Sequence, residues 1–398
     1  MKKDLRPLGL YIHIPFCRCK CAYCDFYSLP GQDESRMDAY LDALTQHLRE
    51  VAPRAAAYEV DTVYFGGGTP SIFGVERLKK LLKTVRKSYR LSKHAEVTLE
   101  ANPESARDVK ALKSLRRAGF NRISLSVQSM DDEMLRQLGR VHSAEDVRAA
   151  VQAIRKAGIQ NLSLDLMYAL PGQTIEHWQQ TLVDTIALQP EHLSCYALKI
   201  EEGTPFAARQ DSLDLADDDT QADMYLTAVK TLAQAGYAQY EISNFSREGF
   251  HSRHNAKYWQ LQEYAGFGCG AHSDFGDVRY AYERDLESYL RGELRLSESN
   301  HIPARERTTE YLMLGLRTVR GISKGEFESI SRFPFSCIEP VLLRCRDAGY
   351  AVEENGRWHL TPEGFLVSNA IIGEVTDAAL SEQRRRADAI ARGSFCPV

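Results

Sequence analysis

The chain has 398 residues, of which 43% are hydrophobic and 26% are charged, and its formal net charge is −4. This composition is typical of a globular protein with room for two or three domains, and the weak negative charge argues against a nucleic-acid binder. No apolar run approaches the roughly 20 residues of a membrane-spanning helix, and the first residues lack the apolar core of a signal peptide. Its nine cysteines, odd in number and partly clustered, favour a reducing cytoplasm over a disulfide framework.

Short apolar runs alternate with longer amphipathic segments through the first half of the chain. We expect strands at 9–14, 60–67, 95–102, 121–128, 161–170 and 192–200, and helices that include 75–89 and 106–119. Strands that alternate with helices predict parallel β/α units of an α/β protein. Six such units favour a partial (β/α)6 TIM-like barrel over an open doubly wound sheet, and they place the working residues at the carboxyl ends of the strands.

The pattern changes twice in the second half of the chain. Segment 214–236 predicts a helix with aspartates in its first turn, where the helix dipole favours negative charge. Segment 240–273 is rich in aromatic residues, glycine and histidine without a clear period, which is typical of a connector or a ligand site. Later helical segments surround a short predicted hairpin at 353–361, as in a winged-helix module, and the charge favours a packing or partner-binding role.

We therefore expect three parts along the chain. They are a partial barrel at 1–200, an α+β extension at 201–302 and a winged-helix-like domain at 303–398.

Cys17, Cys21 and Cys24 follow the first predicted strand with the spacing C-x3-C-x2-C. On a short loop this spacing lets three thiolates converge on an iron-sulfur cube, because soft thiolates are the preferred ligands of such clusters. Three ligands leave one iron open to a small chelating molecule such as an amino acid. A zinc site that also uses Cys19, or a set of inert thiols, remains an alternative on these residues alone.

Glycine and polar side chains follow several of the predicted strands. Gly67, Gly68 and Thr69 lie in GGGTP, where missing side chains let the backbone approach a ligand, although a plain β-to-α corner uses the same residues. Four further polar residues lie at strand ends or in the loops after them: Glu100, Gln128, Arg140 and Asp165. Arginine can pair with a carboxylate, and carboxylates can accept hydrogen bonds from hydroxyls or amines. Each has a structural alternative, which for Glu100 is a helix cap.

The segment HNAKYW contains His254, Asn255, Tyr258 and Trp259. On a helix His254 and Tyr258 are one turn apart and face the same way, which sets an imidazole beside an aromatic wall. Histidine in such apolar surroundings commonly holds haem iron. An aromatic core cluster around a hydrogen-bonded histidine is the alternative, and the residues alone favour it.

Several motifs together resemble the radical S-adenosylmethionine (SAM) superfamily. YIHIPFC, CDF, GGGTPS, EANPES and SLSVQS are similar to motifs of the branch that contains oxygen-independent coproporphyrinogen oxidases and HemW-type haem chaperones. The resemblance runs through nearly the whole chain. It implies a 4Fe-4S cluster on Cys17, Cys21 and Cys24, with SAM on the open iron. Cys19 lies outside the family pattern, and we expect it to be a solvent-side thiol that can replace a ligand after damage.

The resemblance also implies a set of ligand-binding residues. Those expected to bind SAM are Tyr11, Gly67, Gly68, Thr69, Glu100, Gln128, Arg140 and Asp165. H-N-x-x-Y-W is similar to the haem-binding motif of the HemW-type chaperones. Those expected to bind haem are therefore His254, Asn255, Tyr258 and Trp259. We expect His13 to be a hydrogen-bonded core histidine, and Cys195 and Cys269 to pack as small hydrophobic residues.

The sequence departs from the oxidase pattern in two places. Asp25 and Phe26 follow Cys24, whereas the oxidases carry a further cysteine two residues after the last cluster ligand. The oxidases also have a long segment before the first barrel strand, and only a short one precedes it here. We therefore expect a cytoplasmic haem chaperone that passes haem to an unidentified acceptor protein, with a membrane-associated acceptor allowed. The alternative is an enzyme, a coproporphyrinogen dehydrogenase or another radical SAM enzyme that acts on a tetrapyrrole.

Overall fold

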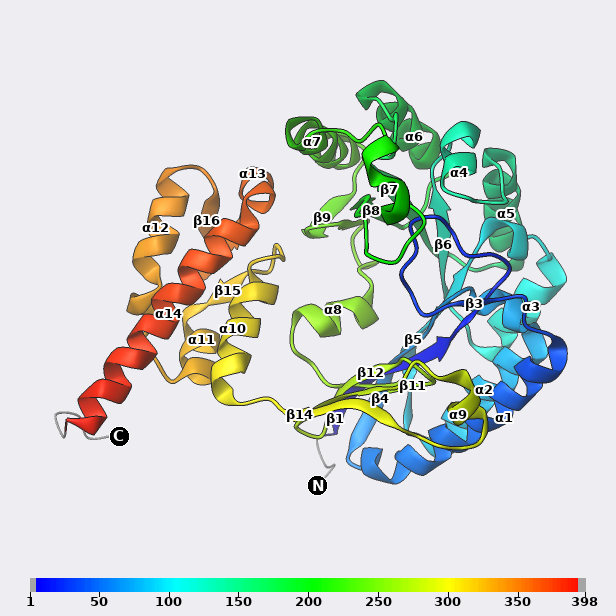
Figure 1. Cartoon of the computed structure of the whole chain (residues 1–398), viewed down its shortest axis with the longest axis horizontal. Helices are drawn as coiled ribbons and strands as arrows, with labels where there is room; N and C mark the ends of the chain where they lie inside the picture. Colours follow the sequence, from blue (N-terminus) through cyan, green and yellow to red (C-terminus); the bar gives the residue numbers. More distant parts are fainter. Residues whose placement is uncertain (1–4, 393–398) are drawn as a thin grey trace. The chain divides into compact units, whose positions relative to one another are not determined.

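The computed structural model describes residues 5–392, and its contacts divide the chain into two compact units. The first unit contains the residues up to Ala238 together with Phe245–Lys257 and Gln262–His301. The second unit contains Gln239–Asn244, Tyr258–Leu261 and the residues from Ile302 onward. Figure 1 shows both units, with labels on the helices and on many of the strands. The three-part division expected from the sequence remains a prediction.

The first unit is built around a curved sheet whose central strands are parallel. These strands are β1 (Arg6–Ile14), β4 (Tyr58–Gly67), β5 (Leu91–Ala101), β6 (Arg122–Gln128), β7 (Asn161–Tyr168) and β8 (His192–Ala197). Each pairs in parallel with the next. The helices along the outside of the curve in Figure 1 are α1 (Glu34–Val51), α2 (Val75–Ser88), α3 (Val109–Ala118), α4 (Asp132–Gln137), α5 (Ala144–Ala157) and α6 (Ile175–Ala187). The expected α/β fold with these six strands is confirmed.

Alternation along the strands gives the sheet two different faces. In β1, Leu10 and Ile12 are fully buried and alternate with Tyr11 and His13. Successive side chains of a strand point to opposite faces, so the aliphatic pair packs on one face and the polar pair lies on the other. β6, β7 and β8 place serines and Asp165 on the inner face. The interior is therefore a polar lumen, unlike the branched apolar core of many closed barrels.

Four further strands continue the sheet beyond β1. β11 (Tyr264–Phe267) pairs in parallel with β1, and β12 (His272–Phe275), β13 (Val278–Tyr282) and β14 (Leu296–His301) follow as antiparallel neighbours. The sequence showed no period here because the first strands are short and glycines interrupt them. A Cβ on Gly266 would lie 2.1 Å from the carbonyl oxygen of His272, so only glycine permits this close approach.

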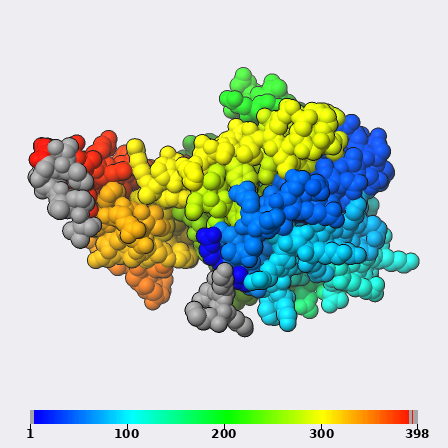
Figure 2. Space-filling view, turned by 90° about the horizontal axis from the view of Figure 1, so that it is seen from below, coloured from blue at the N-terminus to red at the C-terminus, as the bar shows by residue number. Residues whose placement is uncertain are grey.

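Contacts distant in sequence fix this added part of the sheet. Figure 2 shows the yellow segment that ends in β14 lying against the blue segment of α1. The helix α9 (Leu286–Leu290) precedes β14, and Tyr289 in it lies with its hydroxyl 2.9 Å from Nδ1 of His47 in α1. Arg36 of α1 also pairs with Glu287 of α9. The strands therefore belong to the same packed body as the N-terminal helices.

The predicted acid-capped helix is α7 (Asp218–Gln234). The side chain of Asp217 accepts a hydrogen bond from the backbone N–H of Thr220, and Asp218 and Asp219 occupy the first turn. The carboxylates satisfy and stabilise the N-terminal end of the helix, as the sequence indicated.

Among the described residues no helix is both long and apolar enough to span a membrane.

The second unit combines helices with a small sheet. Its helices are α10 (Ala304–Gly315), α11 (Lys324–Ser331), α12 (Glu339–Asp347), α13 (Pro362–Leu366) and α14 (Ser368–Ala391), and its strands are β15 (Ile322–Ser323), β16 (Ala351–Glu354) and β17 (Arg357–Leu360). β16 and β17 form the expected hairpin. Asn355 and Gly356 take positive φ values at its turn, which matches the twist of a two-residue hairpin loop.

Three short elements lie where the chain passes between the two units. They are β9 (Ala238–Glu241), β10 (Asn244–Ser246) and α8 (Arg253–Trp259). The HNAKYW segment forms most of α8, so the helix expected there is present.

Candidate functional site

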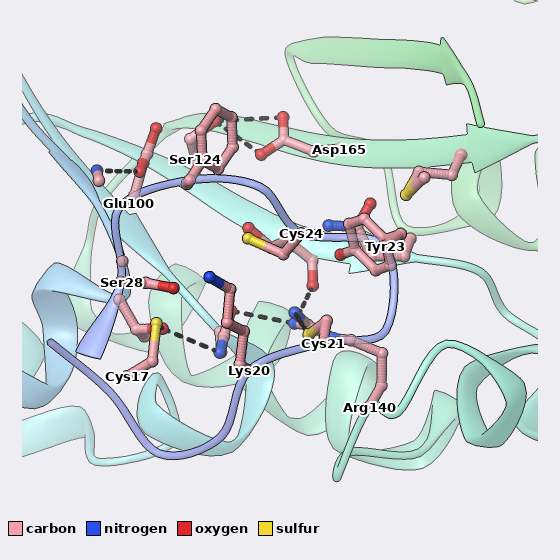
Figure 3. Close-up of a pocket in the computed structure, with 18 of the residues that line it drawn as sticks. Cys17, Lys20, Cys21, Tyr23, Cys24, Ser28, Glu100, Ser124, Arg140 and Asp165 are labelled. Atoms are coloured by element: carbon pink, nitrogen blue, oxygen red, sulfur yellow. Dashed lines mark hydrogen bonds between the residues drawn. The ribbon is translucent and has the colours of Figure 1, made fainter. Parts of the chain in front are cut away.

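A cavity of about 380 Å³ opens at the carboxyl ends of the central strands (Figure 3). Its wall is formed by the cysteine loop, by the glycine turn after β4 and by polar side chains from β5 to β8. The predicted site residues that line it are Cys17, Cys21, Cys24, Gly67, Gly68, Thr69, Glu100, Gln128, Arg140, Asp165 and Asn255. The fold therefore brings most of the predicted residues to one place, although they come from distant parts of the sequence.

The cysteine loop is closed at its base and anchored at its middle. The short strands β2 (Phe16–Cys17) and β3 (Leu29–Pro30) pair in parallel where the loop begins and ends. At its middle, the backbone N–H of Ala22 donates to the carbonyl oxygen of Leu138, and that of Phe206 donates to the carbonyl oxygen of Ala22. These bonds hold the loop against the end of α4 and the segment that follows β8, so the thiols face the cavity from a fixed backbone.

The three predicted cluster ligands have polar neighbours of different kinds. Cys17 Sγ lies 3.4 Å from Thr69 Oγ1, and Cys21 Sγ accepts a hydrogen bond from Arg140 Nη1 at 3.5 Å. Burial raises the pKa of the Cys17 and Cys24 thiols. Both are therefore neutral near pH 7 in this state, and a bound metal centre would supply the positive charge that stabilises thiolates. Cys19 is exposed, with Sγ 4.0 Å from the carbonyl oxygen of Gly139.

A single metal ion needs several ligand side chains close together. Within residues 5–392 no three histidine, cysteine or carboxylate side chains lie close enough together to bind one metal ion. In a 4Fe-4S cube each thiolate binds a different iron atom, so its ligands stand farther apart than the four ligands of one zinc ion. Three cysteines around an open cavity fit the donor set of such a cube.

The glycine turn packs directly against the cysteine loop. A Cβ on Gly68 would lie 2.6 Å from the carbonyl oxygen of Phe16 and 2.9 Å from Cys17 Sγ. The backbone N–H of Thr69 donates to the same carbonyl at 2.7 Å. Gly67 has φ of 120°, which side chains rarely adopt, and its N–H donates to Glu100 Oε2 at 3.1 Å. The turn is therefore more than a corner between a strand and a helix, since it forms part of the cavity wall.

Two buried carboxyl groups line the lumen. Glu100 accepts hydrogen bonds from the Tyr64 hydroxyl at 2.7 Å and from Gly67 N–H, and burial raises its pKa to about 7. It does not cap a helix. Asp165 accepts from the Ser124 hydroxyl at 3.0 Å, and burial raises its pKa as well. Because burial disfavours the ionised forms, a positively charged ligand in the cavity would stabilise both carboxylates.

Arg140 places a cation on the cavity wall. Its Nη2 donates to Asn102 Oδ1 and to the carbonyl oxygen of Ser126, both at 2.9 Å, while Nη1 faces Cys21. Gln128 ends β6 with φ of 66°, in the left-handed region that costs a residue with a side chain about 1 kcal/mol or more. This conformation follows a shift in register after Ser126, beyond which Gln128 pairs with Leu166 of β7 and lines the cavity.

Tyr11 and His254 lie in a layer of rings next to the cavity. The His254 ring stacks on Tyr64 with centroids 5.1 Å apart, and Tyr11 stacks on Tyr64 at 6.3 Å. Tyr64 lines the cavity, whereas Tyr11 and His254 lie behind it. A Cβ on Gly66 would lie 3.0 Å from both tyrosine rings, which explains the first glycine of the motif.

The polar residues of α8 are anchored in the barrel. His254 is 1% exposed and its Nδ1 lies 2.9 Å from Thr62 Oγ1, while Lys257 Nζ pairs with Asp61 at 2.7 Å. Glu96 accepts a hydrogen bond from the His254 backbone N–H. Burial, together with the charges of Lys257 and Arg122, lowers the pKa of His254 to about 3. The His254 ring is thus buried and hydrogen-bonded to Thr62, as a core histidine would be.

The remaining residues of the motif differ in their surroundings. Asn255 lines the cavity. Tyr258 and Trp259 are grouped with the second unit. The prediction that these residues bind haem is not tested by this arrangement.

His13, Cys195 and Cys269 are not part of the cavity wall. His13 is buried, with one ring nitrogen at the Tyr11 hydroxyl and the other at the Tyr27 carbonyl, as expected of a core histidine. Cys195 and Cys269 are buried, as predicted. Cavity residues that sequence reasoning missed include Tyr64, Asn102, Glu104, Arg122 and Ser124. Asn102 and Glu104 lie within the EANPES motif, which could have pointed to them. Tyr64, Arg122 and Ser124 alternate with apolar residues along their strands, and this alternation could have placed them on the inner face of the sheet.

The fold and the cavity define a class of protein. The family model of the Radical SAM superfamily matches residues 11–184, and that of the HemN C-terminal domain matches residues 302–367. The structure of coproporphyrinogen III oxidase (HemN) from Escherichia coli, a radical SAM enzyme, superimposes with a TM-score of 0.80 and 25% identity over 94% of this chain and 90% of that chain. The chain therefore has the radical SAM fold.

Relatives with higher identity narrow the class. Heme chaperone HemW from Haemophilus influenzae is 36% identical over 92% of this chain and 97% of its own length. The proteins of the same name from Bacillus subtilis and Escherichia coli are 34% and 35% identical, over 91% and 92% of this chain and 97% and 98% of their own lengths. The chain belongs to the HemW family of radical SAM proteins.

Proposed function

We propose that this protein is a haem chaperone that binds haem, carries a 4Fe-4S cluster with SAM and passes haem to an acceptor protein. The observation that carries the proposal is the similarity, over 92% of the chain, to a protein named heme chaperone HemW. The cavity supports it, because three cysteines and a set of polar groups suited to an amino acid and a ribose line one space. Haem, the cluster and SAM are the cofactors that this proposal requires.

Each part of the cavity has a role in the proposal. Cys17, Cys21 and Cys24 hold the cluster, which supplies a one-electron centre with an open iron. The turn at Gly67–Thr69 receives the amino-acid end of SAM, and Arg140 pairs with its carboxylate. Glu100, Gln128 and Asp165 accept or donate hydrogen bonds to the rest of the molecule. Tyr11 supports this wall through its stack on Tyr64.

The haem role is assigned to the segment with His254, Asn255, Tyr258 and Trp259. Ligation of haem iron by Nε2 of His254 leaves the Nδ1 hydrogen bond with Thr62 in place, but the ring is 1% exposed and has to be uncovered before haem can reach it. Haem loading in this proposal therefore includes a movement of α8. An aromatic pair at Tyr258 and Trp259 offers apolar faces to a porphyrin.

The compartment and the partner follow from the same chemistry. All eight cysteines within the described residues are free, and a thiolate-bound cluster needs a reducing compartment. We propose a cytoplasmic protein whose acceptor is a haem protein, in the cytoplasm or at a membrane. Nucleic acid is not a proposed partner.

An enzyme is the second candidate. The similarity to coproporphyrinogen III oxidase favours a coproporphyrinogen dehydrogenase or another radical SAM reaction on a tetrapyrrole. Phe26 stands where the oxidases have their further cysteine, and its side chain is 65% exposed. This departure within the cavity wall disfavours the oxidase reaction.

Two assays on one anaerobic preparation separate the candidates. Haem is titrated by absorbance, and carbon dioxide release from coproporphyrinogen is measured with reductant and SAM. The chaperone predicts one tightly bound haem per chain and no carbon dioxide above a control without protein. Sustained conversion to protoporphyrinogen would overturn the proposal, whatever the haem titration shows, and absence of haem binding would overturn it as well.

A further inference from the structure

Asn102 connects two parts of the cavity wall through both ends of its amide. Its Oδ1 accepts a hydrogen bond from Arg140 Nη2 at 2.9 Å, and its Nδ2 donates to Thr69 Oγ1 at 3.3 Å and to Glu104 Oε1 at 3.3 Å. A side-chain amide has one acceptor oxygen and two donor hydrogens, so these contacts use both donors. Both donor hydrogens and the oxygen of this side chain are therefore used in hydrogen bonds to other residues of the cavity wall.

The orientation of this amide is fixed by its neighbours. Arg140 can only donate and the Glu104 carboxylate can only accept. The carbonyl end of Asn102 must then face Arg140, and its NH2 end must face Glu104 and Thr69. The Glu104 side chain is 7% exposed and stands 3.8 Å from the ring of His142, which is buried. The group that sets the orientation is thus a buried one.

Each end of the Asn102 amide is connected to a different cysteine through one intermediate residue. On the acceptor side, Nη1 of Arg140 donates to Cys21 Sγ at 3.5 Å. On the donor side, Thr69 Oγ1 lies 3.4 Å from Cys17 Sγ. Figure 3 shows Cys17, Cys21 and Arg140 around the same part of the cavity. A single amide therefore links the surroundings of two thiols that are separate along the loop.

We propose that Asn102 is a positioning residue that orients Cys17 and Cys21 through Thr69 and Arg140 and presents Arg140 to the carboxylate of a bound amino-acid ligand. This inference rests on the proposed function, because it assumes that the thiols hold a cluster. Partners one layer behind metal ligands commonly change metal affinity 10- to 100-fold when they are removed. Thr69 and Arg140 are such partners here, and Asn102 would act on both of them together.

The chain offers a matched control in Asn121. Its Oδ1 accepts from the backbone N–H of Val97 and its Nδ2 donates to the carbonyl oxygen of Ala95, both at 2.8 Å. It therefore bonds through both ends of its amide and joins β5 to β6, as a structural residue away from the cavity. The substitution Asn121→Asp removes the donor end just as Asn102→Asp does.

The full-length wild type, Asn102→Asp and Asn121→Asp are reconstituted anaerobically and compared. Asn102→Asp loses the donor to Thr69 and sets a second carboxylate beside Glu104. We expect it to release iron to a chelator about 10-fold faster or more, and to bind SAM about 10-fold more weakly in a titration of the reduced-cluster spectrum. Asn121→Asp should match wild type in both measurements, and the thermal midpoints of the cluster-free variants are recorded so that a loss of fold stability is told apart from a loss of cluster.

A second substitution guards against a fold defect. Asn102→Ala removes the amide without adding charge, and we expect the same direction of change in both measurements. Iron release and SAM binding within twofold of wild type for both Asn102 variants would overturn the inference, and so would equal losses in Asn121→Asp. If the wild type itself takes up no cluster, the proposed function fails rather than this inference alone.

Discussion

The cysteine loop and the helix α8 both carry residues that commonly bind metals, but the fold uses them differently. The loop places Cys17, Cys21 and Cys24 on the wall of an open cavity. In α8 the fold turns His254 toward Thr62 and Lys257 toward Asp61, and both side chains are buried. A metal-binding residue type therefore indicates a ligand site most directly where the fold has left an open space beside it.

This contrast predicts different consequences for substitutions. Changes in the cysteine loop should act on the cofactor and leave the fold nearly intact, because the loop backbone is held by its own hydrogen bonds. Changes at His254 should act on the fold first, because removal of a buried, hydrogen-bonded ring leaves a cavity and an unpaired partner.

The largest expected effect is complete loss of the cluster when a predicted ligand is removed. Cys17→Ala, Cys21→Ala and Cys24→Ala should each retain little iron and sulfide after anaerobic reconstitution, because a cube needs all three thiolates. Cys19→Ala should keep a wild-type amount, since Cys19 is exposed and outside the spacing. Iron and sulfide are counted per chain. A cluster that survives in Cys17→Ala but is lost in Cys19→Ala would show that the ligand assignment is wrong.

A smaller effect, on the fold, is expected in α8. His254→Ala should lower the free energy of unfolding of the cluster-free protein by about 2–4 kcal/mol, because a buried ring and its bond to Thr62 are lost. Asn255→Ala, next to it on the cavity wall, should change it by less than about 1 kcal/mol. Denaturant unfolding measures both. A change below about 0.5 kcal/mol for His254→Ala would mean that the ring does not anchor the helix.

The variant His254→Ala also sharpens the haem assignment. If His254 ligates haem iron, His254→Ala should weaken haem binding in a titration under conditions where the variant is still folded. Haem binding equal to wild type in folded His254→Ala would remove this histidine from the proposed site.

The smallest effect is a pH dependence of SAM binding. Burial raises the pKa of Glu100 from 4.5 to about 7, so the folded protein binds more protons here than the unfolded chain between these values. This carboxyl therefore favours the fold at low pH, and its contribution is lost as the pH rises through 7. SAM carries a positive sulfonium, which stabilises the ionised carboxylate, so its affinity should rise several-fold from pH 6 to pH 8.

Two variants test whether Glu100 is the responsible group. Glu100→Gln should remove the rise in affinity. Tyr64→Phe should move it to higher pH, because the tyrosine hydroxyl donates to the carboxylate and lowers its pKa. A pH dependence that persists unchanged in Glu100→Gln would assign it to another group.

Much of the barrel could be predicted from the sequence because its strands are long and their pattern is regular. The six expected strands, the acid-capped helix after Asp217 and the hairpin at Asn355 and Gly356 all have strong local signals. β11 to β14 could not be predicted, since each has only four to six residues and glycines lie in or beside β11 and β12. Their pairing depends on contacts such as the close approach of Gly266 to His272.

The candidate site divides in a similar way. The cysteines, the glycine turn and Glu100 could be singled out because their residue types and positions at strand ends are informative. Asn102 and Tyr64 could not, because an asparagine or a tyrosine becomes part of a site only through partners brought in by the fold. The residues alone favoured a hydrogen-bonded core histidine at His254, but its partners Thr62 and Glu96 could not be predicted, since they lie far from it in the sequence.

The central claim is that the cavity holds a cluster whose open iron takes SAM, and one spectrum tests it most directly. The reduced cluster of the reconstituted wild type is recorded by electron paramagnetic resonance as SAM is added. The account predicts that the signal changes and that the change saturates at one SAM per chain. An intact cluster whose signal is unaltered by excess SAM would contradict it.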